Sequence, residues 1–424
     1  MRRTGRHELT RGASAGFRLP PLGGLPLEAR VITSVYYDVP GGSLAVAGIA
    51  LLRRTEDGRS IWQLRLPVEE SCLELEEDGD QGQPPSAALK LLRAHLRHGP
   101  LERIAELRTR GSRELELELG LRSGSAAHLE LLARELAAAG GEPRDDLPRQ
   151  TTAEPSGSPI EGLRSLLREQ LCEIERHDPG TRLGRDPESL HDMRVAVRRT
   201  RALLRAGKKL IAADMSELDG RLKELGAVLG EVRDLDVLLA RLEDEAGELG
   251  GEDARQARSL LAALRTERSC SRARLLAALR SEQYLSLLDD TAQAIEELEP
   301  SGAALTLDDV ADRAFAKVRK AVHALPDEPA DAELHRVRKL GKRARYAGEL
   351  VGRKEFVRRA KALQDVLGEH QDAVVAGERI RELAAGASPR QAVAAGRLVE
   401  REQERRAAAR ATWREAWKRL RKTI

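Results

Sequence analysis

The chain has 424 residues, and a length of this order suggests two or three domains rather than one. Only 2% of the residues are aromatic and 33% are charged, which favours helices with wide solvated faces and cores of Leu, Ala and Val. The formal net charge of +3 excludes a generally cationic protein, so strong basicity can only be local.

Cysteine usage and hydropathy bound the cellular setting. Cys72, Cys172 and Cys270 show neither a CxxC nor a zinc-ligand spacing, so we expect a reducing, cytoplasmic environment. The basic N-terminus is not followed by an apolar segment, and no stretch approaches 18 uncharged residues. We therefore expect neither a signal peptide nor a membrane span.

Residues 1–147 carry the strand patterns of the chain and are expected to form a small α+β domain. Three segments are rich in β-branched residues or alternate at period two: Val31–Tyr37, Ile61–Leu66 and Glu114–Leu119. Turn signals stand at Gly41-Gly42 and Asp57-Gly58, and helix patterns cover residues 87–107 and 127–138.

Residues 148–159 read PRQTTAEPSGSP, a polar segment without periodicity that is typical of a linker. Beyond it, residues 160–424 show a succession of helix patterns, with a clear helix start at Asp186-Pro187-Glu188. Breaks are predicted at 178–180, 184–187, 250–251, 300–302, 326–329 and 388–389. The helical part divides into two repeats, at about 160–300 and 303–424.

A basic pattern occurs once in each repeat. It reads His191-x2-Arg194-x3-Arg198-Arg199-x-Arg201 and, 144 positions on, His335-x2-Arg338-x3-Lys342-Arg343-x-Arg345. Offsets of 0, 3, 7 and 10 fall on one face of a helix, so each pattern forms a stripe of one histidine and three cations. Two such stripes indicate a site for a polyanion.

A second motif follows each stripe in the same order. Leu229–Asp234 and Leu367–Asp372 both read LGExxD. A stripe and an LGExxD motif that recur in register indicate a duplicated helical unit.

The residues leave several roles open for the stripes. Their cations could form solvated helix faces, which are common in a chain rich in arginine. The histidines could orient neighbouring helices, for instance through Asp234 or Asp372, or contact phosphate directly, where partial protonation near pH 7 would help. A metal site is disfavoured because neither stripe has a histidine or carboxylate three or four positions after its histidine.

The segments LHDMRVAVRRTRALLRAG, LGEVRDLDVLLARL, LHRVRKLGKRARYAGEL and LGEHQDAVV resemble the CHAD domain, the conserved-histidine α-helical domain, over residues 158–424. The resemblance implies two antiparallel four-helix bundles related by a pseudo-twofold axis, with the stripes lining a central groove that binds inorganic polyphosphate. The implied binding residues are His191, Arg194, Arg198, Arg199, Arg201, Arg205, His335, Arg338, Lys339, Lys342, Arg343 and Arg345.

Residues 36–67 and 107–118 resemble the CYTH domain, a β-barrel whose tunnel binds triphosphate and which often precedes CHAD. The family opens with an ExExK strand, whereas Thr10 and Gly12 stand here where the second acid and the lysine belong. The stretch between Arg110 and Glu114 is also too short for the strands expected there, so we predict an incomplete barrel that has lost its activity.

We therefore expect a non-enzymatic protein that binds polyphosphate, needs no cofactor and associates with polyphosphate granules in the cytoplasm. The alternative is a triphosphatase that uses Mg²⁺ or Mn²⁺ in the CYTH-like half. Its candidate residues would be Glu8, Glu114, Glu116, Glu118, Arg54 and Arg65, with Glu114, Glu116 and Glu118 holding the metal. Nucleic-acid binding is disfavoured because the stripes lack interleaved aromatic residues. The sequence does not indicate an oligomeric state.

Overall fold

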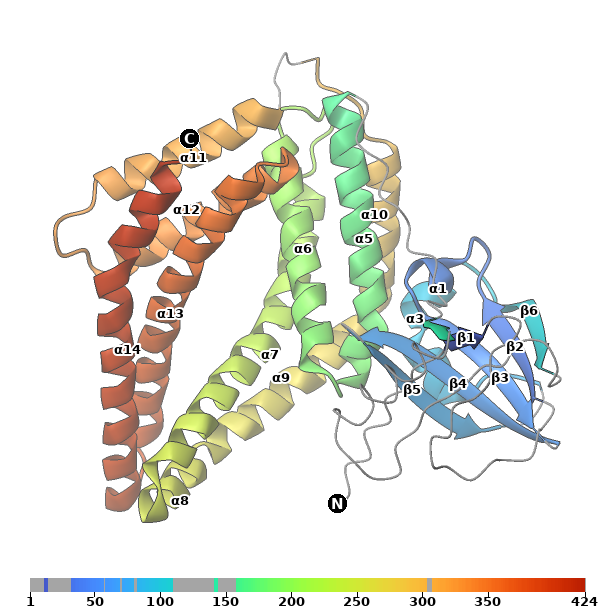
Figure 1. The fold of residues 1–424 in the computed structure, drawn as a ribbon, viewed down its shortest axis with the longest axis horizontal. Coiled ribbons are helices and arrows are strands. Elements are labelled where there is room, and N and C mark those ends of the chain that lie inside the picture. The colour runs from blue at the N-terminus through green and yellow to red at the C-terminus, as the bar shows by residue number, and fades with distance from the viewer. Residues whose placement is uncertain are drawn as a thin grey trace. The chain divides into compact units, whose positions relative to one another are not determined.

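The computed structural model describes residues 11–13, 32–56, 58–68, 71–79, 82–109, 141–143, 158–302 and 307–423. The chain divides into two compact units, Met1–Ala153 with Asp178–Asp186, and Glu154–His177 with Pro187–Ile424. The protein is mainly helical, with a small antiparallel sheet in the first unit (Figure 1). This confirms the predicted fold class, while the predicted domain boundaries stay predictions.

The first unit contains a five-stranded antiparallel sheet that does not close into a barrel, with the order β5-β4-β3-β2-β6. Its strands are β2 (Ile32–Asp38), β3 (Ala50–Glu56), β4 (Arg59–Val68), β5 (Ser71–Asp78) and β6 (Glu102–Thr109). The predicted strands at 31–37 and 61–66 are confirmed as β2 and β4. A separate pair joins β1 (Arg11–Ala13) to β7 (Gly141–Pro143).

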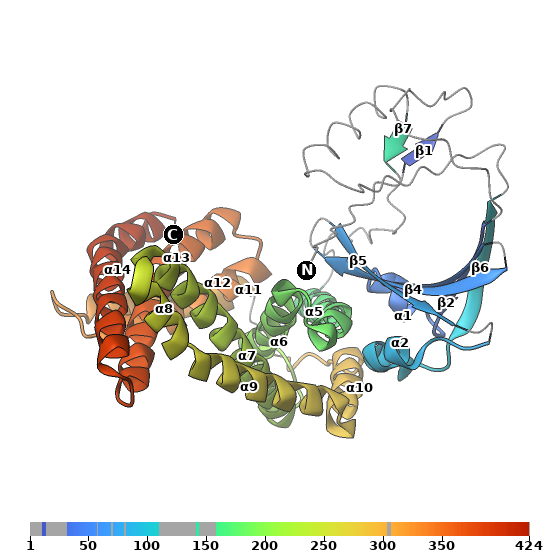
Figure 2. The same cartoon turned by 90° about the horizontal axis from the view of Figure 1, so that it is seen from below.

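One face of this sheet carries the core of the unit. Trp62, Leu64 and Leu66 alternate along β4 and pack with Leu44 of α1 (Ser43–Val46) and Ala88 of α2 (Ser86–Leu91). Both helices therefore lie on the same side of the sheet (Figure 2). Because side chains alternate along a strand, Gln63 and Arg65 of β4 lie on the opposite face of the sheet.

The predicted helix over 87–107 is wrong in its second half. The helical turns end with α3 (Arg93–Leu96), and Gly99 has a φ of 137°, a conformation that favours glycine. Gly99 and Pro100 stop the helix, and the alternating residues of β6 then pair with β2. The predicted strand at 114–119, the predicted helix at 127–138 and positions 148–157 of the predicted linker lie outside the described residues.

The long helices follow residue 158 and fall within the ranges of the two predicted repeats, while Asp178–Asp186, which include the end of the first of these helices, belong to the first unit. Helices of the first repeat are α5 (Pro159–Leu183), α6 (Pro187–Gly207), α7 (Ser216–Leu249), α8 (Gly251–Leu260), α9 (Ala262–Arg280) and α10 (Glu282–Glu296). Those of the second are α11 (Leu307–His323), α12 (Asp331–Leu350), α13 (Lys354–Ala384) and α14 (Pro389–Arg421). Each predicted break from 184–187 onward separates two helices.

The break predicted at Asp178-Pro179-Gly180 is wrong, because α5 continues through Pro179 to Leu183. A proline inside a helix removes one backbone hydrogen bond. Here the buried Arg182 donates from Nε to Asp178 Oδ1 (2.6 Å) and from Nη2 to Asp178 Oδ2 (3.1 Å). This ion pair bridges the turn that contains the proline and holds the helix together there.

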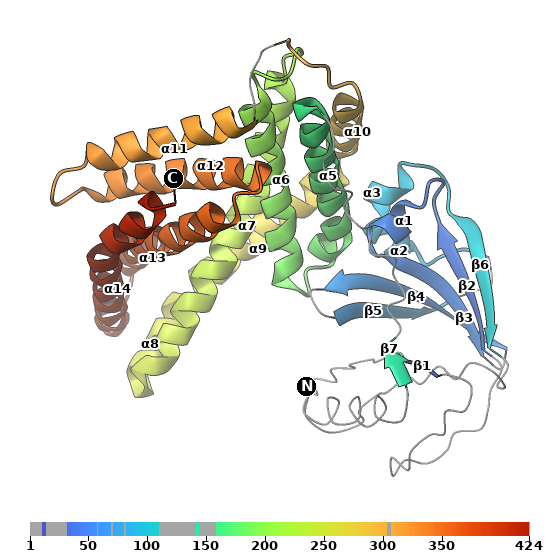
Figure 3. The same ribbon diagram turned by 45° about the horizontal axis from the view of Figure 1, so that its top comes forward.

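Two apolar clusters organise the second unit. One packs α11 to α14 around Phe315, Leu363 and Trp413, and Figure 3 shows α11 and α12 side by side in this arrangement. The other joins the repeats, because Leu242 of α7 and Leu264 of α9 pack with Leu398 of α14. No helix in the described part of the chain is long and apolar enough to span a bilayer.

Candidate anion-binding site

The first stripe lies on α6 beside a buried apolar row. Leu190, Met193 and Val197 recur at spacings of three and four and fix which face of α6 points inward. The stripe comprises His191, Arg194, Arg198, Arg199, Arg201 and Arg205. Only Arg205 is exposed, and the others are half-buried, so the stripe is not a freely solvated helix face.

The second stripe lies on α12 in the same relation to its core. Leu334, Val337 and Ala344 are buried within the cluster of the second repeat. The stripe comprises His335, Arg338, Lys339, Lys342, Arg343 and Arg345. Lys339 and Arg343 are exposed, as expected for a solvated helix face, whereas the other members of the stripe are half-buried.

The two stripes meet at Tyr346, one position after the second stripe. Arg198 of α6 donates from Nε to the Tyr346 hydroxyl at 2.6 Å, and the Arg345 guanidinium lies 4.6 Å from the centroid of the Tyr346 ring. A further ion pair joins Arg199 Nε to Glu349 Oε2 of α12 at 3.6 Å. Cations from both repeats therefore converge in one region of the second unit.

The LGExxD aspartates pair with arginines of the stripes. Arg194 Nη2 lies 3.1 Å from Asp234 Oδ1, and Arg338 Nη2 lies 3.9 Å from Asp372 Oδ1. The sequence interpretation that these aspartates could hold the histidines is therefore wrong. The arginine three positions after each histidine reaches the aspartate instead.

The surroundings of the histidines at the head of the two stripes favour the uncharged imidazole. Burial, and next the Arg233 guanidinium, lower the pKa of His191 below its usual value. Burial, and next the Lys339 ammonium, lower the pKa of His335 in the same way. Phosphate contact assisted by partial protonation near pH 7 is therefore disfavoured, and a neutral orienting role fits both histidines better.

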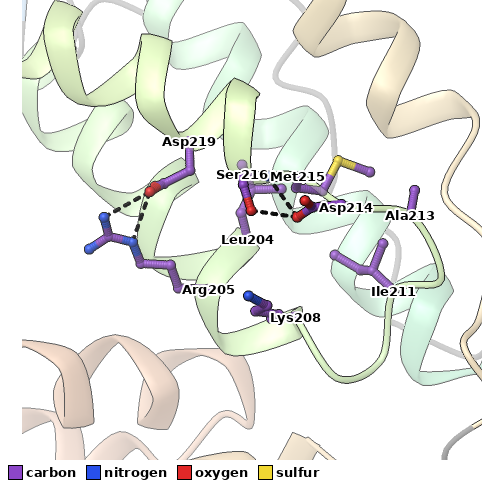
Figure 4. A pocket seen from close by; sticks show the side chains of 9 residues that line it. All are labelled: Leu204, Arg205, Lys208, Ile211, Ala213, Asp214, Met215, Ser216 and Asp219. Atoms are coloured by element: carbon purple, nitrogen blue, oxygen red, sulfur yellow. Dashed lines mark hydrogen bonds and ion pairs between the residues drawn. The ribbon is translucent and has the colours of Figure 1, made fainter.

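Carboxylates also neutralise the ends of the stripes. Asp219 of α7 pairs with Arg201 at 3.1 Å and with Arg205 at 2.8 Å. Arg205 and Asp219 line a cavity of about 190 Å³, and Figure 4 shows their side chains turned toward one another at its edge. On α12, Arg345 pairs with Glu349 at 2.6 Å. The ends of the stripes therefore carry less free charge than the sequence suggests.

Lys342 lies near the centre of the convergence without a hydrogen bond or ion pair to any residue that the structure describes. Burial lowers its pKa to about 7, and the nearby charges of Arg338, Arg198 and Arg194 act in the same direction. Asp372 opposes them. An unpaired, partly buried ammonium among guanidinium groups is destabilised until an anion compensates it.

Some stripe cations have no carboxylate partner within the described ranges: Arg198, Lys339, Lys342 and Arg343. Arg198 and Lys342 are half-buried and come from different repeats. A ligand that supplied negative charge to both would relieve their repulsion, whereas the other arginines already have acidic partners.

The candidate residues of the first unit are partly described. Arg54 pairs with Glu56 at 3.7 Å and Arg65 with Glu74 at 3.3 Å. Arg54 lies directly opposite Ile61 of β4, and Ile61 and Arg65 point to the same side of that strand. Arg54 and Arg65 therefore share the sheet face opposite the core. Glu8, Glu114, Glu116 and Glu118 lie outside the described residues, and within the described part no group of histidine, cysteine and acidic side chains could hold a metal ion.

Sequence reasoning missed Tyr346, Asp219 and Glu349. Tyr346 directly follows the second stripe, but its partner Arg198 is 148 positions away. Glu349 lies one turn beyond Arg345, and this spacing of four residues was the one available signal for it.

Comparisons with known proteins agree with the helical architecture. Two uncharacterized proteins of Mycobacterium tuberculosis, from strains CDC 1551 / Oshkosh and H37Rv, are each 28% identical to this chain over 432 residues. The alignments cover 84% of this chain and 83% of each relative.

Two solved structures are similar. PptA from Streptomyces chartreusis has 26% identity and a TM-score of 0.54, over 62% of this chain and 100% of PptA. The CHAD domain from the plant Ricinus communis has 27% identity and a TM-score of 0.53, over 64% of this chain and 95% of that domain. The CHAD domain model matches residues 165–381, which is just over half of the sequence and includes both stripes. The chain therefore belongs to the CHAD domain family.

Proposed function

We propose that this CHAD-family protein binds inorganic polyphosphate along the stripes of α6 and α12 without hydrolysing it. The observation that carries the proposal is the convergence of Arg198 and Lys342, one from each repeat, at a place where neither has a carboxylate partner among the described residues. A linear anion with a charge on every unit can compensate both cations at once.

The side-chain chemistry suits such a ligand. The guanidinium fork of an arginine can donate to two non-bridging oxygens, while a lysine ammonium acts as a point charge. Arg194 and Arg338 would exchange an aspartate for a phosphate, or share the two. This exchange favours an anion of high charge density over one whose charges are widely spaced.

We further propose that binding brings the protein to polyphosphate granules in the cytoplasm, and that the first unit is a CYTH-like domain without hydrolase activity. The open sheet supports the second point, as does the engagement of Arg54 and Arg65 with Glu56 and Glu74. A tunnel that hydrolyses triphosphate would need cations directed at phosphate and carboxylates directed at a metal.

Titration of the full-length protein with long-chain polyphosphate, tripolyphosphate, ATP and single-stranded DNA tests the proposal. We expect long-chain polyphosphate to bind tightest, because it alone combines high charge density with the length to follow both stripes. The four uncompensated cations predict a fall in affinity on the order of fiftyfold between 50 and 200 mM salt. Equal or tighter binding of single-stranded DNA would indicate a nucleic-acid-binding protein instead.

Phosphate release is the measurement that tests the enzymatic alternative. We expect no release from tripolyphosphate or ATP in the presence of Mg²⁺ or Mn²⁺. Turnover that disappears on Glu116→Gln but persists on Glu404→Gln, a change on α14, would show that the first unit is an active triphosphatase.

A further inference from the structure

The repeated LGExxD motif lies directly beneath one arginine of each stripe. A Cβ atom added to Gly230 on α7 would stand 3.3 Å from Arg194 Nε and 3.6 Å from its Nη2. A Cβ atom added to Gly368 on α13 would stand 3.6 Å from Arg338 Nη2 and 3.7 Å from its Nε. In both repeats the guanidinium therefore lies against the helix backbone at the glycine of the motif.

The aspartate of the motif holds the same guanidinium. Asp234 and Asp372 come four residues after the glycines, one helical turn along the same face. They lie 3.1 Å from Arg194 and 3.9 Å from Arg338. Each guanidinium therefore lies between the glycine backbone and the aspartate of the motif, with the closer ion pair at Arg194.

The other two motif residues anchor this arrangement to the helical bundle. Leu229 and Leu367 are buried, with exposed fractions of 0% and 2%. Glu231 accepts from Ser271 Oγ of α9 at 3.1 Å, and Glu369 accepts from Arg241 Nη2 of α7 at 3.0 Å. The leucine and the glutamate thus tie the motif to the helical bundle in both repeats, although the two glutamates have different partners.

We propose that LGExxD is an arginine seat, in which the glycine leaves room for the guanidinium and the aspartate orients it toward the bound anion. Gly230 and Asp234 position Arg194, and Gly368 and Asp372 position Arg338. This proposal rests on the proposed binding of polyphosphate. It adds to that function residues that position the binding arginines without having to contact the ligand themselves.

Gly230→Ala provides the test, because the added methyl group displaces Arg194 while alanine remains the better helix former. We expect polyphosphate affinity to fall about fivefold, as when one charge-assisted hydrogen bond is weakened, with no fall in Tm. Gly368→Ala should cause a smaller loss, since its Cβ meets Arg338 at an ordinary contact distance. Gly220→Ala is the matched control, because that α7 position has nothing within 4 Å of the added Cβ.

A double-mutant cycle separates positioning from a general structural effect. In an Arg194→Ala background, Gly230→Ala should cost no further affinity, because there is no guanidinium left to displace. Two results would contradict the proposal. One is an unchanged affinity of the Gly230→Ala variant, and the other is an equally large loss on Gly230→Ala in the Arg194→Ala background.

The position of Arg194 can also be tested in the protein without ligand. The Nε–Hε resonance of Arg194, measured by NMR, should shift and broaden in Gly230→Ala and in Asp234→Ala but not in Gly220→Ala. If the unmodified protein failed to bind polyphosphate, the proposed function would fall while this resonance would still decide whether the seat exists. Resonances that coincide in all three variants would overturn it.

Discussion

Replacing Arg198 and Lys342 together with glutamate is expected to weaken polyphosphate binding by at least about a thousandfold. These two cations have no carboxylate partner among the described residues, so their charge is available to a ligand. Each loses a charge-assisted contact worth roughly 2 kcal/mol, and each new carboxylate also repels the anion. Isothermal titration with long-chain polyphosphate measures the effect.

The matched control reverses two exposed arginines outside the stripe helices, Arg280→Glu and Arg390→Glu. It changes the net charge by the same amount, so a site of defined geometry predicts a loss of no more than about tenfold through long-range screening. The neutral pair Arg198→Gln and Lys342→Gln controls for misfolding. It loses the same two contacts without added repulsion, so affinity should still fall by roughly several hundredfold with unchanged circular dichroism.

Single substitutions test whether both repeats contribute. Arg198→Glu on α6 and Lys342→Glu on α12 should each weaken binding by a similar factor, because the two cations lie in one region of the second unit. If one substitution removed all binding and the other had no effect, a site on a single helix would replace the site shared by both stripes.

The stripes could be predicted because their information is local. The identity of the cations and their spacing along one helix determine that Arg194 and Arg198 share a face, whatever the rest of the chain does. The helix start at Pro187 is local in the same sense, since proline and its flanking acids are sufficient to indicate it. The structure places both stripes on the helices expected for them.

The electrostatic state of the stripes could not be predicted, because it depends on distant residues. Arg194 meets Asp234 from the next helix, and Arg198 meets Tyr346 from the other repeat. Spacing in the sequence carries no information about such contacts. The error at Pro179 has the same origin, since the buried pair of Asp178 and Arg182 compensates a local signal that on its own favours a break.

Polyphosphate affinity is expected to fall as the pH rises, by about twentyfold between pH 6.5 and 8.5. The cause is Lys342, whose pKa in the free protein is lowered to about 7 by burial and by Arg338, Arg198 and Arg194, with Asp372 opposing. A bound phosphate favours the charged ammonium and raises this pKa, so the complex holds a proton that the free protein loses above pH 7. Binding therefore takes up a proton, and affinity is greatest on the acidic side.

Lys342→Arg isolates this effect, because arginine keeps its charge throughout the pH range while preserving a cation at the same position. The variant should bind with little pH dependence between 6.5 and 8.5, and any titration of the ligand itself cancels in the comparison. Burial lowers the pKa values of His191 and His335, so both titrate toward the acidic end of this window, and Lys342→Arg keeps any contribution they make unchanged. Equal slopes for the variant and the unmodified protein would show that Lys342 does not take up the proton. A flat profile in the unmodified protein would mean that Lys342 carries the same charge in the free and bound states.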